Sequence, residues 1–339
     1  MTTRIGIDAR KIADYGIGTY IRGLLGGLEE LSPEEEIVVF APENGREKIP
    51  AAFEHVVVDA PHYSVKELLV IGQGIRRARL DLFHAPHYVT PLTRVPTVVT
   101  IHDLIHLHQP QRNPAAPLYA RMMIGRAFAN ASRVLTVSEA VKRQLAARYG
   151  NAEKIVVTPN GVDARFTAEG PRASGRYVLF AGNDKPHKNL ETVVEAIARV
   201  EGLQLVLAGG DFSRFASRER VVVSGFVADD ELAALYRGAV AVVVPSREEG
   251  FGLPAAEAMA CGAAVITSDA AALVEVTGDA ALHVEALDVA AWADAIASIA
   301  GDESLRHELG ARGRSRAAQF TWRACAEATL RTYREALFS

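Results

Sequence analysis

The densest group of residues that could do chemistry lies between Pro245 and Glu257, in the run Pro-Ser-Arg-Glu-Glu-Gly-Phe-Gly-Leu-Pro-Ala-Ala-Glu. We expect a strand to end at Pro245 and a helix to begin near Pro254, because proline suits the first turn of a helix. Four backbone amides then gather at a helix N-terminus, where the helix dipole favours an anion such as phosphate. These amides belong to Gly250, Phe251, Gly252 and Leu253.

Two carboxylates bracket this anion site, Glu249 in the loop and Glu257 in the helix. A carboxylate repels a nearby phosphate, so both side chains need another task. Accepting hydrogen bonds from sugar hydroxyls is the natural one, because a diol presents two donors side by side. The alternative is a plain turn with two solvated glutamates, and we would prefer it if the sequence had only one of the two. The two glutamates and the four amides together indicate a ligand that has both a phosphate and a sugar.

A second polar cluster covers residues 181–189, again where a strand is expected to meet a helix. Lys185 and Lys188 flank a turn that Pro186 stiffens. Both lysines could reach a diphosphate as point charges. The alternative is a pair of solvated lysines at the start of a helix. The position at a strand end favours the phosphate interpretation.

A pair of glycines, Gly16 and Gly18, follows the first expected strand. The run is similar to the fingerprint of dinucleotide-binding turns but departs from it, since Ile21 stands where the third glycine belongs. We expect the two glycines to let the backbone approach a ligand closely. A plain turn is the alternative.

His102 ends the strand that we expect over residues 97–102. At the carboxyl end of a parallel strand, this histidine would act as a hydrogen-bonding partner or as a general acid or base. A structural histidine is the alternative. His84, His87 and His108 are interpreted as loop histidines.

Several motifs are absent from the sequence. It contains no phosphate-binding Walker loop, no zinc-ligand spacing, no Asp-x-Asp pair and no Gly-x-Ser-x-Gly elbow. We therefore expect lysines, backbone amides and a helix dipole to neutralise a bound phosphate, with no divalent metal and no cofactor.

Short β-branched runs alternate with longer helical segments, which is typical of parallel α/β folds. Strands are expected at residues 4–8, 37–41, 56–59, 82–85, 97–102, 134–138 and 154–158, and then at 177–182, 203–208, 221–224, 240–245 and 264–267. Helices are expected at 18–31, 65–78, 139–149, 189–200, 229–237, 254–261, twice between 289 and 319, and at 321–337.

A turn-rich stretch between Asn160 and Gly175 interrupts this alternation and indicates a domain boundary. We expect two Rossmann-like, doubly wound domains, an N-terminal one over residues 1–168 and a C-terminal one over residues 169–320. Ligands of such sheets bind outside the carboxyl ends of the strands, here in a cleft between the domains. The last helix, within residues 321–339, should cross back onto the first domain.

The composition is that of a globular protein, with 49% hydrophobic and 23% charged residues in 339. The 37 Lys and Arg against 41 Asp and Glu make a nucleic-acid partner unexpected. Cys261 and Cys325 are expected to be buried thiols in a reducing compartment. With no signal peptide and no long apolar segment, we expect a cytoplasmic location.

The motifs together resemble those of the retaining, sugar-nucleotide-dependent glycosyltransferases of family 4. The resemblance rests on the Glu249-to-Glu257 run and on the stretches 6–18, 136–140, 159–163 and 180–190, so it extends over essentially the whole chain. It implies the GT-B fold, in which two Rossmann-like domains face a cleft.

The resemblance also implies roles for residues in the second half. Glu257 matches the glutamate that binds the donor ribose, and Glu249 matches the one that meets the donor sugar. The amides of residues 250–253 match the cradle of the diphosphate and sugar. Lys188 matches the lysine on the donor diphosphate. Many members have an arginine where this chain has Asn183, and Lys185 is our candidate to supply the missing charge.

In the first half, His102 matches the active-site histidine near the transferred sugar. Gly16 and Gly18 match the loop that approaches the phosphates. The resemblance thus predicts transfer of a hexose with retention and without a metal, and mannose from GDP-mannose is the favoured donor. A donor phosphate oxygen would receive the acceptor proton in a same-face attack.

The acceptor is expected to be a glycan or a lipid-linked glycan bound by the N-terminal domain. Two basic stretches with apolar residues, 68–79 and 112–133, would allow peripheral membrane contact. The alternative is helices that cover a sheet, with their charges in solvent. Other interpretations are a UDP-sugar-dependent transferase, a non-hydrolysing epimerase, a two-domain binding protein and a catalytically silent partner subunit.

Overall fold

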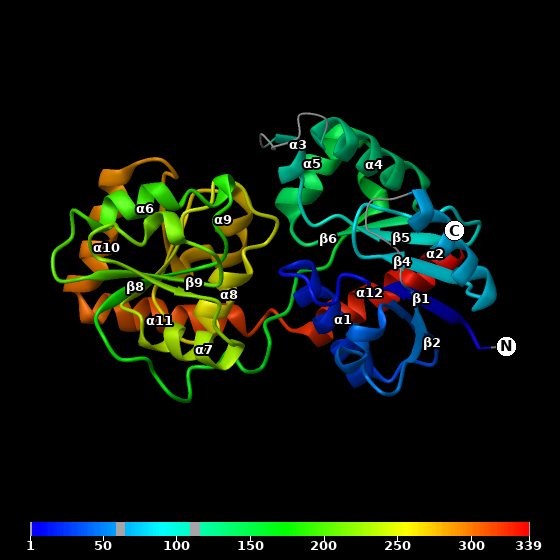
Figure 1. The fold of residues 1–339 in the computed structure, drawn as a ribbon, viewed down its shortest axis with the longest axis horizontal. Coiled ribbons are helices and arrows are strands. Elements are labelled where there is room, and N and C mark those ends of the chain that lie inside the picture. Colours follow the sequence, from blue (N-terminus) through cyan, green and yellow to red (C-terminus); the bar gives the residue numbers. More distant parts are fainter. Residues whose placement is uncertain (1, 59–64, 109–115, 339) are drawn as a thin grey trace. The chain divides into compact units, whose positions relative to one another are not determined.

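The computed structural model describes residues 2–58, 65–108 and 116–338. It divides into two compact units, one formed by Met1–Gly161 with Thr321–Ser339 (unit 1) and the other by Val162–Phe320 (unit 2). The division falls inside the turn-rich stretch, ahead of residue 168, where the sequence places the boundary. The two units are coloured blue to green and green to orange in Figure 1, where the red C-terminal helix belongs to unit 1.

Unit 1 is built on a seven-stranded parallel sheet in the order β3-β2-β1-β4-β5-β6-β7. Its central strands are buried along nearly their whole length, because helices on the faces of a parallel sheet leave no side for water. The strands are β1 (Arg4–Asp8), β2 (Glu36–Ala41), β3 (Glu54–Val57), β4 (Leu82–Ala85), β5 (Thr97–Thr100), β6 (Arg133–Thr136) and β7 (Ile155–Val157).

The helices of unit 1 are α1 (Ile17–Leu31), α2 (Val65–Arg77), α3 (Ile105–His108), α4 (Ala116–Asn130), α5 (Glu139–Tyr149) and α12 (Trp322–Leu337), with the 3-10 turns η1 (Glu43–Lys48) and η2 (Ala152–Lys154). The final helix α12 packs along α1 and shares a hydrophobic core with it. Tyr333 of α12 is fully buried in that core. The C-terminal helix therefore completes the first domain, as the sequence predicts.

Unit 2 is built on a six-stranded parallel sheet in the order β10-β9-β8-β11-β12-β13. Its strands are β8 (Tyr177–Ala181), β9 (Gln204–Ala208), β10 (Val221–Gly225), β11 (Ala241–Val244), β12 (Val265–Ser268) and β13 (Ala281–Val284). Its helices are α6 (Leu190–Ile197), α7 (Asp229–Gly238), α8 (Leu253–Ala260), α9 (Ala271–Thr277), α10 (Val289–Gly301) and α11 (Glu303–Ala317), with the 3-10 turns η3 (Pro186–Lys188), η4 (Ser213–Phe215) and η5 (Gly278–Ala280).

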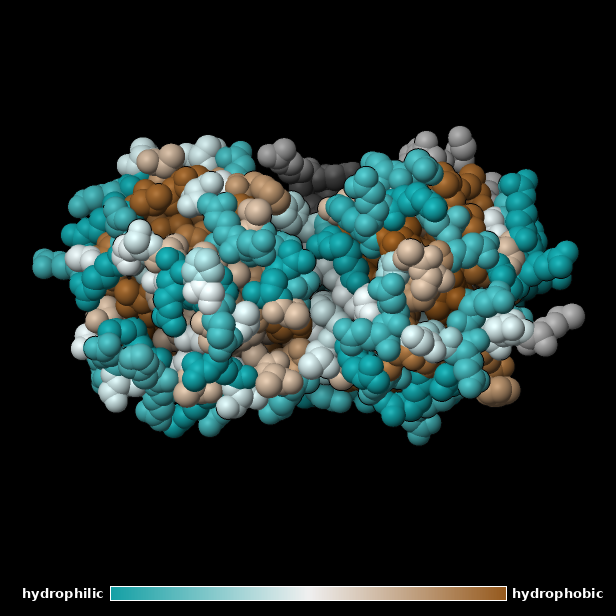
Figure 2. Space-filling model, turned by 90° about the horizontal axis from the view of Figure 1, so that it is seen from below, coloured by the Kyte–Doolittle hydropathy of each residue, from teal (hydrophilic) through white to brown (hydrophobic). Residues whose placement is uncertain are grey.

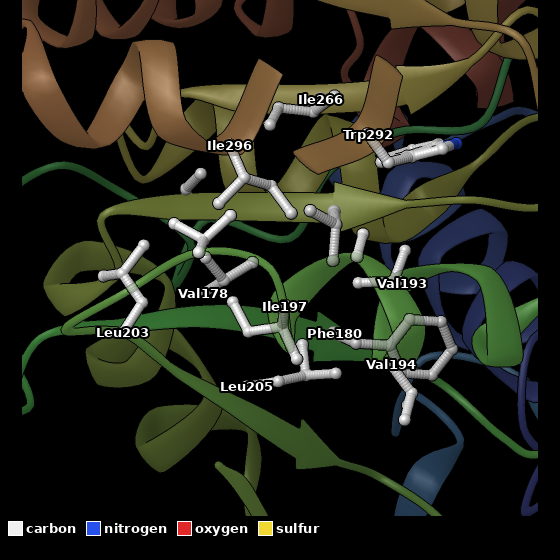
Figure 3. Close-up of a cluster of buried hydrophobic side chains, with 14 of the residues drawn as sticks. Val178, Phe180, Val193, Val194, Ile197, Leu203, Leu205, Ile266, Trp292 and Ile296 are labelled. Carbon is white, nitrogen blue, oxygen red and sulfur yellow. The ribbon is translucent and has the colours of Figure 1, made fainter. Parts of the chain in front are cut away.

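The core of unit 2 lies where α6 and α10 pack against each other over the sheet. Figure 3 shows Val178 and Leu205 on strands meeting Ile197 of α6, with Trp292 and Ile296 of α10 beside them. Trp292 is fully buried. Burial of such a side chain contributes on the order of 2–3 kcal/mol.

Both sheets reverse their strand order at one place. In unit 1 the order reverses between β1 and β4, and in unit 2 between β8 and β11. The loops that leave the carboxyl ends of these two strands turn to opposite faces of the sheet, so a crevice opens between them, and ligands of doubly wound sheets bind there. The switch point of unit 2 thus lies between the loop after β8 and the loop after β11.

The predicted fold class is confirmed, and most predicted elements match the observed ones to within two residues. The strand predicted over residues 97–102 ends at Thr100, so His102 lies in the following loop. Helices α3, α4 and α9 and strand β13 were not predicted. The basic stretch 112–133 falls partly outside the described residues, and most of its described part forms α4.

Within the described part of the chain, no helix combines the length and the apolar character that a membrane span needs. Figure 2 shows one face of the molecule, on which hydrophilic side chains surround smaller hydrophobic areas.

The contact between α1 and α12 depends on a glycine. A Cβ atom on Gly27 would lie 2.4 Å from the backbone oxygen of Trp322, whereas a Cβ on the neighbouring Gly26 meets open space. We expect Gly27→Ala to destabilise the protein by roughly 1–3 kcal/mol through overpacking. Gly26→Ala should stabilise it by up to about 1 kcal/mol through helix propensity. Thermal unfolding of both variants checks this, and equal melting temperatures would contradict the packing.

Candidate functional site

The loop after β8 carries the two predicted phosphate-binding lysines. Pro186 begins the 3-10 turn η3, because its fixed φ suits a first helical position. Lys185 precedes this turn and is exposed, while Lys188 ends it. Asn189 then takes a left-handed backbone conformation with φ of 54° and begins helix α6. The turn thereby directs the chain from the sheet into the helix within a few residues.

Asn189 ties this loop to two others. Its side-chain Nδ2 donates to the backbone oxygens of Pro245, at 3.1 Å, and of Ala286, at 2.6 Å. Its Oδ1 accepts from the hydroxyl of Thr192 at 3.0 Å. The loops that follow β11 and β13 are therefore anchored to the residue next to Lys188. This role of Asn189 was not predicted, although an asparagine between a turn and a helix was a usable signal.

The loop after β11 leads into helix α8 as the sequence predicts. Gly252 is the N-cap residue with φ of +95°, and a Cβ there would lie 2.4 Å from Leu273, so only glycine fits this position. Leu253 and Pro254 form the first turn. Phe251 is buried, with its ring edge-on to Phe320 at 5.3 Å. The N-terminal amides of α8 thus lie at the predicted anion site, and no side chain caps Gly252.

The structure brings Lys188 and Glu249 together. Lys188 Nζ lies 2.6 Å from Glu249 Oε1, and the two side chains are 15% and 10% exposed. The hydroxyl of Ser246 donates to the same oxygen at 2.7 Å, and Ser268 donates to the backbone oxygen of Ser246. The site therefore joins the ends of β8 and β11, the strands that flank the switch point. Neither serine was predicted.

Glu249 is held in its charged form. Burial by itself raises the pKa of this carboxyl, but the Lys188 ammonium and the Ser246 hydroxyl outweigh burial, so the pKa lies below its ordinary value. An ionised, hydrogen-bonded carboxylate beside a lysine can accept hydrogen bonds from sugar hydroxyls. Its proximity to Lys188 also keeps it from being an isolated negative charge next to a phosphate.

Glu257 has the opposite electrostatics. The pKa of this carboxyl is raised to about 7, mainly by burial and in smaller part by the charges of Asp229 and Asp163, while a hydrogen bond from Tyr236 works in the other direction. The Tyr236 hydroxyl donates to Glu257 Oε2 at 3.0 Å. The two glutamates of the motif thus differ in charge state near neutral pH, although the sequence treats them alike.

Asn183 lies in the loop after β8, half-buried. Its side-chain Oδ1 is buried and has no hydrogen-bond partner among the described residues. The neighbouring Asp184 accepts hydrogen bonds from two guanidinium nitrogens of Arg214, Nε and Nη2. Position 183 has no positive charge, so Lys185 stays our candidate to supply the charge that an arginine at position 183 would give.

Glycine is required at positions 16 and 18 of unit 1 for different structural reasons. Gly16 is the N-cap of α1 with φ of +64°, and a Cβ there would meet open space. Gly18 lies in the first turn of α1, where a Cβ would come within 2.8 Å of the backbone oxygen of Ile12. Gly16 leaves room for a ligand, whereas Gly18 lets α1 approach the preceding loop of its own chain.

His102 lies in the loop after β5 and is half-buried. Its Nε2 is 3.0 Å from the backbone oxygen of Pro86, and its ring meets Tyr20 edge-on at 4.7 Å. Because a carbonyl oxygen only accepts, Nε2 carries the proton and Nδ1 is an acceptor. Burial lowers the pKa of His102, although the bond to Pro86 works in the other direction. The ring is therefore neutral at neutral pH.

A network of buried polar side chains lies close to His102, since His84 and His102 both meet the ring of Tyr20. His84 bonds to the hydroxyls of Tyr333, at 2.6 Å, and Thr100, at 2.7 Å, and burial lowers its pKa to about 3. His84 belongs to strand β4 and His108 to helix α3, so their interpretation as loop histidines was wrong. His87 does lie in a loop, after β4, and its Nε2 is 3.2 Å from the buried Asp8 carboxylate.

Two family models match the chain almost end to end. The model described as "Glycosyltransferase Family 4" matches residues 15–166, and the one described as "Glycosyl transferases group 1" matches residues 163–316. The two matches correspond closely to the two sheets.

Similarities to individual proteins agree with the two family models. The chain is 28% identical to the O-antigen chain mannosyltransferase B of Escherichia coli, over 75% of this chain and 74% of that protein. It is 30% identical to the D-inositol 3-phosphate glycosyltransferase of Nocardia farcinica, over 76% and 67% respectively. The sucrose-phosphate synthase of Thermosynechococcus elongatus superposes with a TM-score of 0.82 at 21% identity, over 98% of each chain, and shows the same fold.

The raised pKa of Glu257 predicts a pH dependence of stability. The folded protein binds the Glu257 proton more tightly than the unfolded chain, whose carboxyl titrates near about 4.3. Its contribution is therefore present at low pH and is lost as the pH rises towards about 7. Relative to Glu257→Gln, which cannot ionise, the wild type should lose up to about 3 kcal/mol across this window.

Urea unfolding of both proteins at several pH values measures this loss. Glu201→Gln, at an exposed position of the same unit, is the matched control and should follow the wild type. A difference between wild type and Glu257→Gln that does not change with pH would contradict the assignment.

Proposed function

The chain belongs to glycosyltransferase family 4, and on that premise we propose that it transfers mannose from GDP-mannose to a glycan or lipid-linked glycan, with retention of anomeric configuration. The similarity to the O-antigen chain mannosyltransferase B of Escherichia coli supports mannose as the donor sugar and a polysaccharide chain as the acceptor. In this proposal unit 2 binds the donor and unit 1 binds the acceptor.

The ion pair of Lys188 with Glu249 is the observation that carries the proposal. It lies at the switch point of unit 2, next to the N-terminus of α8, where a sugar nucleotide fits by its chemistry. We assign Lys188 and the amides of residues 250–253 to the donor diphosphate. We assign Glu249 to the donor sugar and Glu257 to the ribose. Lys185 and Asn183 extend the diphosphate site, and Gly16 and Gly18 belong to the loop near the phosphates.

The reaction breaks the bond between the anomeric carbon and the diphosphate oxygen and forms a bond to an acceptor hydroxyl oxygen on the same face. Lys188, the amides and the α8 dipole stabilise the charge that develops on the diphosphate. A donor phosphate oxygen receives the acceptor proton. Glu249 is held by Lys188 and Ser246, which suits binding rather than covalent attack. His102 offers Nδ1 to a hydroxyl of the transferred sugar. The proposal includes no divalent metal.

Nucleotide binding tests the donor site. We expect calorimetry to show binding of GDP in preference to UDP and ADP, unchanged by EDTA. Lys188→Ala and Glu249→Ala should each reduce transfer roughly 100-fold or more, because charge stabilisation and sugar binding are lost. Glu201→Ala should be unaffected. Preference for UDP would indicate a UDP-sugar transferase instead, and no binding to the folded protein would indicate a silent partner subunit.

A lipid-linked acceptor would bring unit 1 to a membrane surface, and we propose that α4 makes that contact. Leu118 and Met122 of α4 are 62% and 61% exposed, with Arg121 between them. Apolar and basic side chains on one helix are typical of interfacial binding. The double substitution Leu118→Glu and Met122→Glu should weaken co-sedimentation with anionic liposomes at least about ten-fold.

Leu287→Glu is the control, because Leu287 is 58% exposed on unit 2 and should not matter. Wild-type protein that stays in the supernatant would remove the membrane contact from the proposal and leave the donor site untouched.

A further inference from the structure

Tyr236 is a buried tyrosine that no sequence motif singled out. It lies on α7 and has no exposed surface, and its ring packs edge-on against Phe166 with centroids 5.8 Å apart. Its hydroxyl donates to Glu257 Oε2 at 3.0 Å. The hydroxyl of a tyrosine in a core needs a hydrogen-bond partner. Here the partner is the carboxylate of Glu257, the residue that we assign to binding the donor ribose. The hydroxyl is thus fixed by packing and directed at one oxygen of Glu257.

This contact leaves most of the carboxylate available. A carboxylate has about four acceptor positions on its two oxygens, and Tyr236 takes one of them. Glu257 itself is only partly buried. A ligand that carries two neighbouring hydroxyls can therefore use Oε1 and the remaining position on Oε2.

We propose that Tyr236 is a positioning residue of the donor site, whose hydroxyl holds the Glu257 carboxylate in the orientation that accepts the ribose hydroxyls. This inference rests on the proposed function, since it takes Glu257 as the ribose-binding residue.

The surroundings of Glu257 explain why its carboxylate needs an uncharged hydrogen-bond donor such as a tyrosine hydroxyl. Burial and the charges of Asp229 and Asp163 all favour the protonated form, and Tyr236 opposes them. Arg165 lies between those two aspartates, 2.8 Å from Asp163 and 2.9 Å from Asp229, so its charge is directed at them.

Several groups of neighbouring elements lie close to α8. Arg237 of α7 is buried and donates to the backbone oxygens of Pro171 and Thr167, and its charge acts on Cys261. Helix α9 presents Leu273 at Gly252, and α11 presents Gly313 at Met259 and Gly310 at Gly262. Arg314 of α11 lies near Gly262, beyond the end of α8, and Cys261 follows that helix as a thiol whose pKa burial raises to about 12. Among the groups that shift the pKa of Glu257, the Tyr236 hydroxyl is the one that lowers it.

Tyr236→Phe tests the proposal, because it removes one oxygen and keeps the ring against Phe166. The probes are GDP-mannose, UDP-glucose and ADP-glucose, whose diphosphates carry no group that titrates between about pH 5 and about pH 9. Affinity of the wild type should rise as the pH passes about 7, where Glu257 ionises. In Tyr236→Phe we expect affinity roughly ten-fold lower near neutral pH, a midpoint shifted to higher pH, and a smaller deficit at about pH 9.

Tyr177→Phe is the matched control. Tyr177 is a buried tyrosine of the same unit whose hydroxyl donates to the backbone oxygen of Leu235 at 2.8 Å, so its loss also removes a buried hydrogen bond. Its affinity and pH profile should match the wild type. A purely structural role of Tyr236 would give both variants the same profile, and that result would overturn the proposal.

A folding defect is also decisive. An unfolded Tyr236→Phe at about pH 7.5 should refold at about pH 5.5, where Glu257 is protonated and needs no donor. A variant unfolded at both pH values would overturn the proposal. If the folded wild type binds none of the probes, the proposed function fails and this inference with it. If the wild type binds a probe and Tyr236→Phe keeps its profile, this inference alone fails.

Discussion

The contact between Lys188 and Glu249 is possible only because the unit 2 sheet reverses its strand order between β8 and β11. The loops that leave these strands diverge to opposite faces, which creates the crevice that a ligand enters. Asn189 and the backbone of His187 then connect the two loops, through hydrogen bonds to Pro245 and Arg247. The ion pair thus follows from topology first and from side-chain chemistry second.

The two glutamates of one motif show how the surroundings of a side chain decide its charge. Glu249 and Glu257 are both shielded from water, which favours the protonated form of each. Glu249 meets a lysine and a serine hydroxyl, which restore the charge, whereas Glu257 meets a tyrosine and the fields of two aspartates. Glu249, in the loop after β11, is therefore ionised, whereas Glu257, eight residues later in α8, titrates near neutral pH.

Unit 1 depends on buried polar contacts as much as on its apolar core. The Asp8 carboxylate is fully buried, and Arg10 and His87 contact it, so the charge of Arg10 keeps the pKa of Asp8 low in spite of burial. His84 links Thr100 of β5 to Tyr333 of α12. Because buried polar groups without partners are costly, this network specifies how α12 and the strands below His102 fit together.

The sequence by itself determined the parallel α/β class, most strand and helix positions, and the motifs that carry Lys188, Glu249 and Glu257, because hydrophobic period and turn chemistry are local properties. Tertiary structure alone decided which of these residues meet. The bond from Tyr236 to Glu257 joins α7 to α8, and the bond from His84 to Tyr333 joins β4 to α12. Neither has a local signature, since strand order and helix packing place residues distant in sequence side by side. The charge states of Glu257 and His102 were equally hidden, because burial and neighbouring groups exist only after folding.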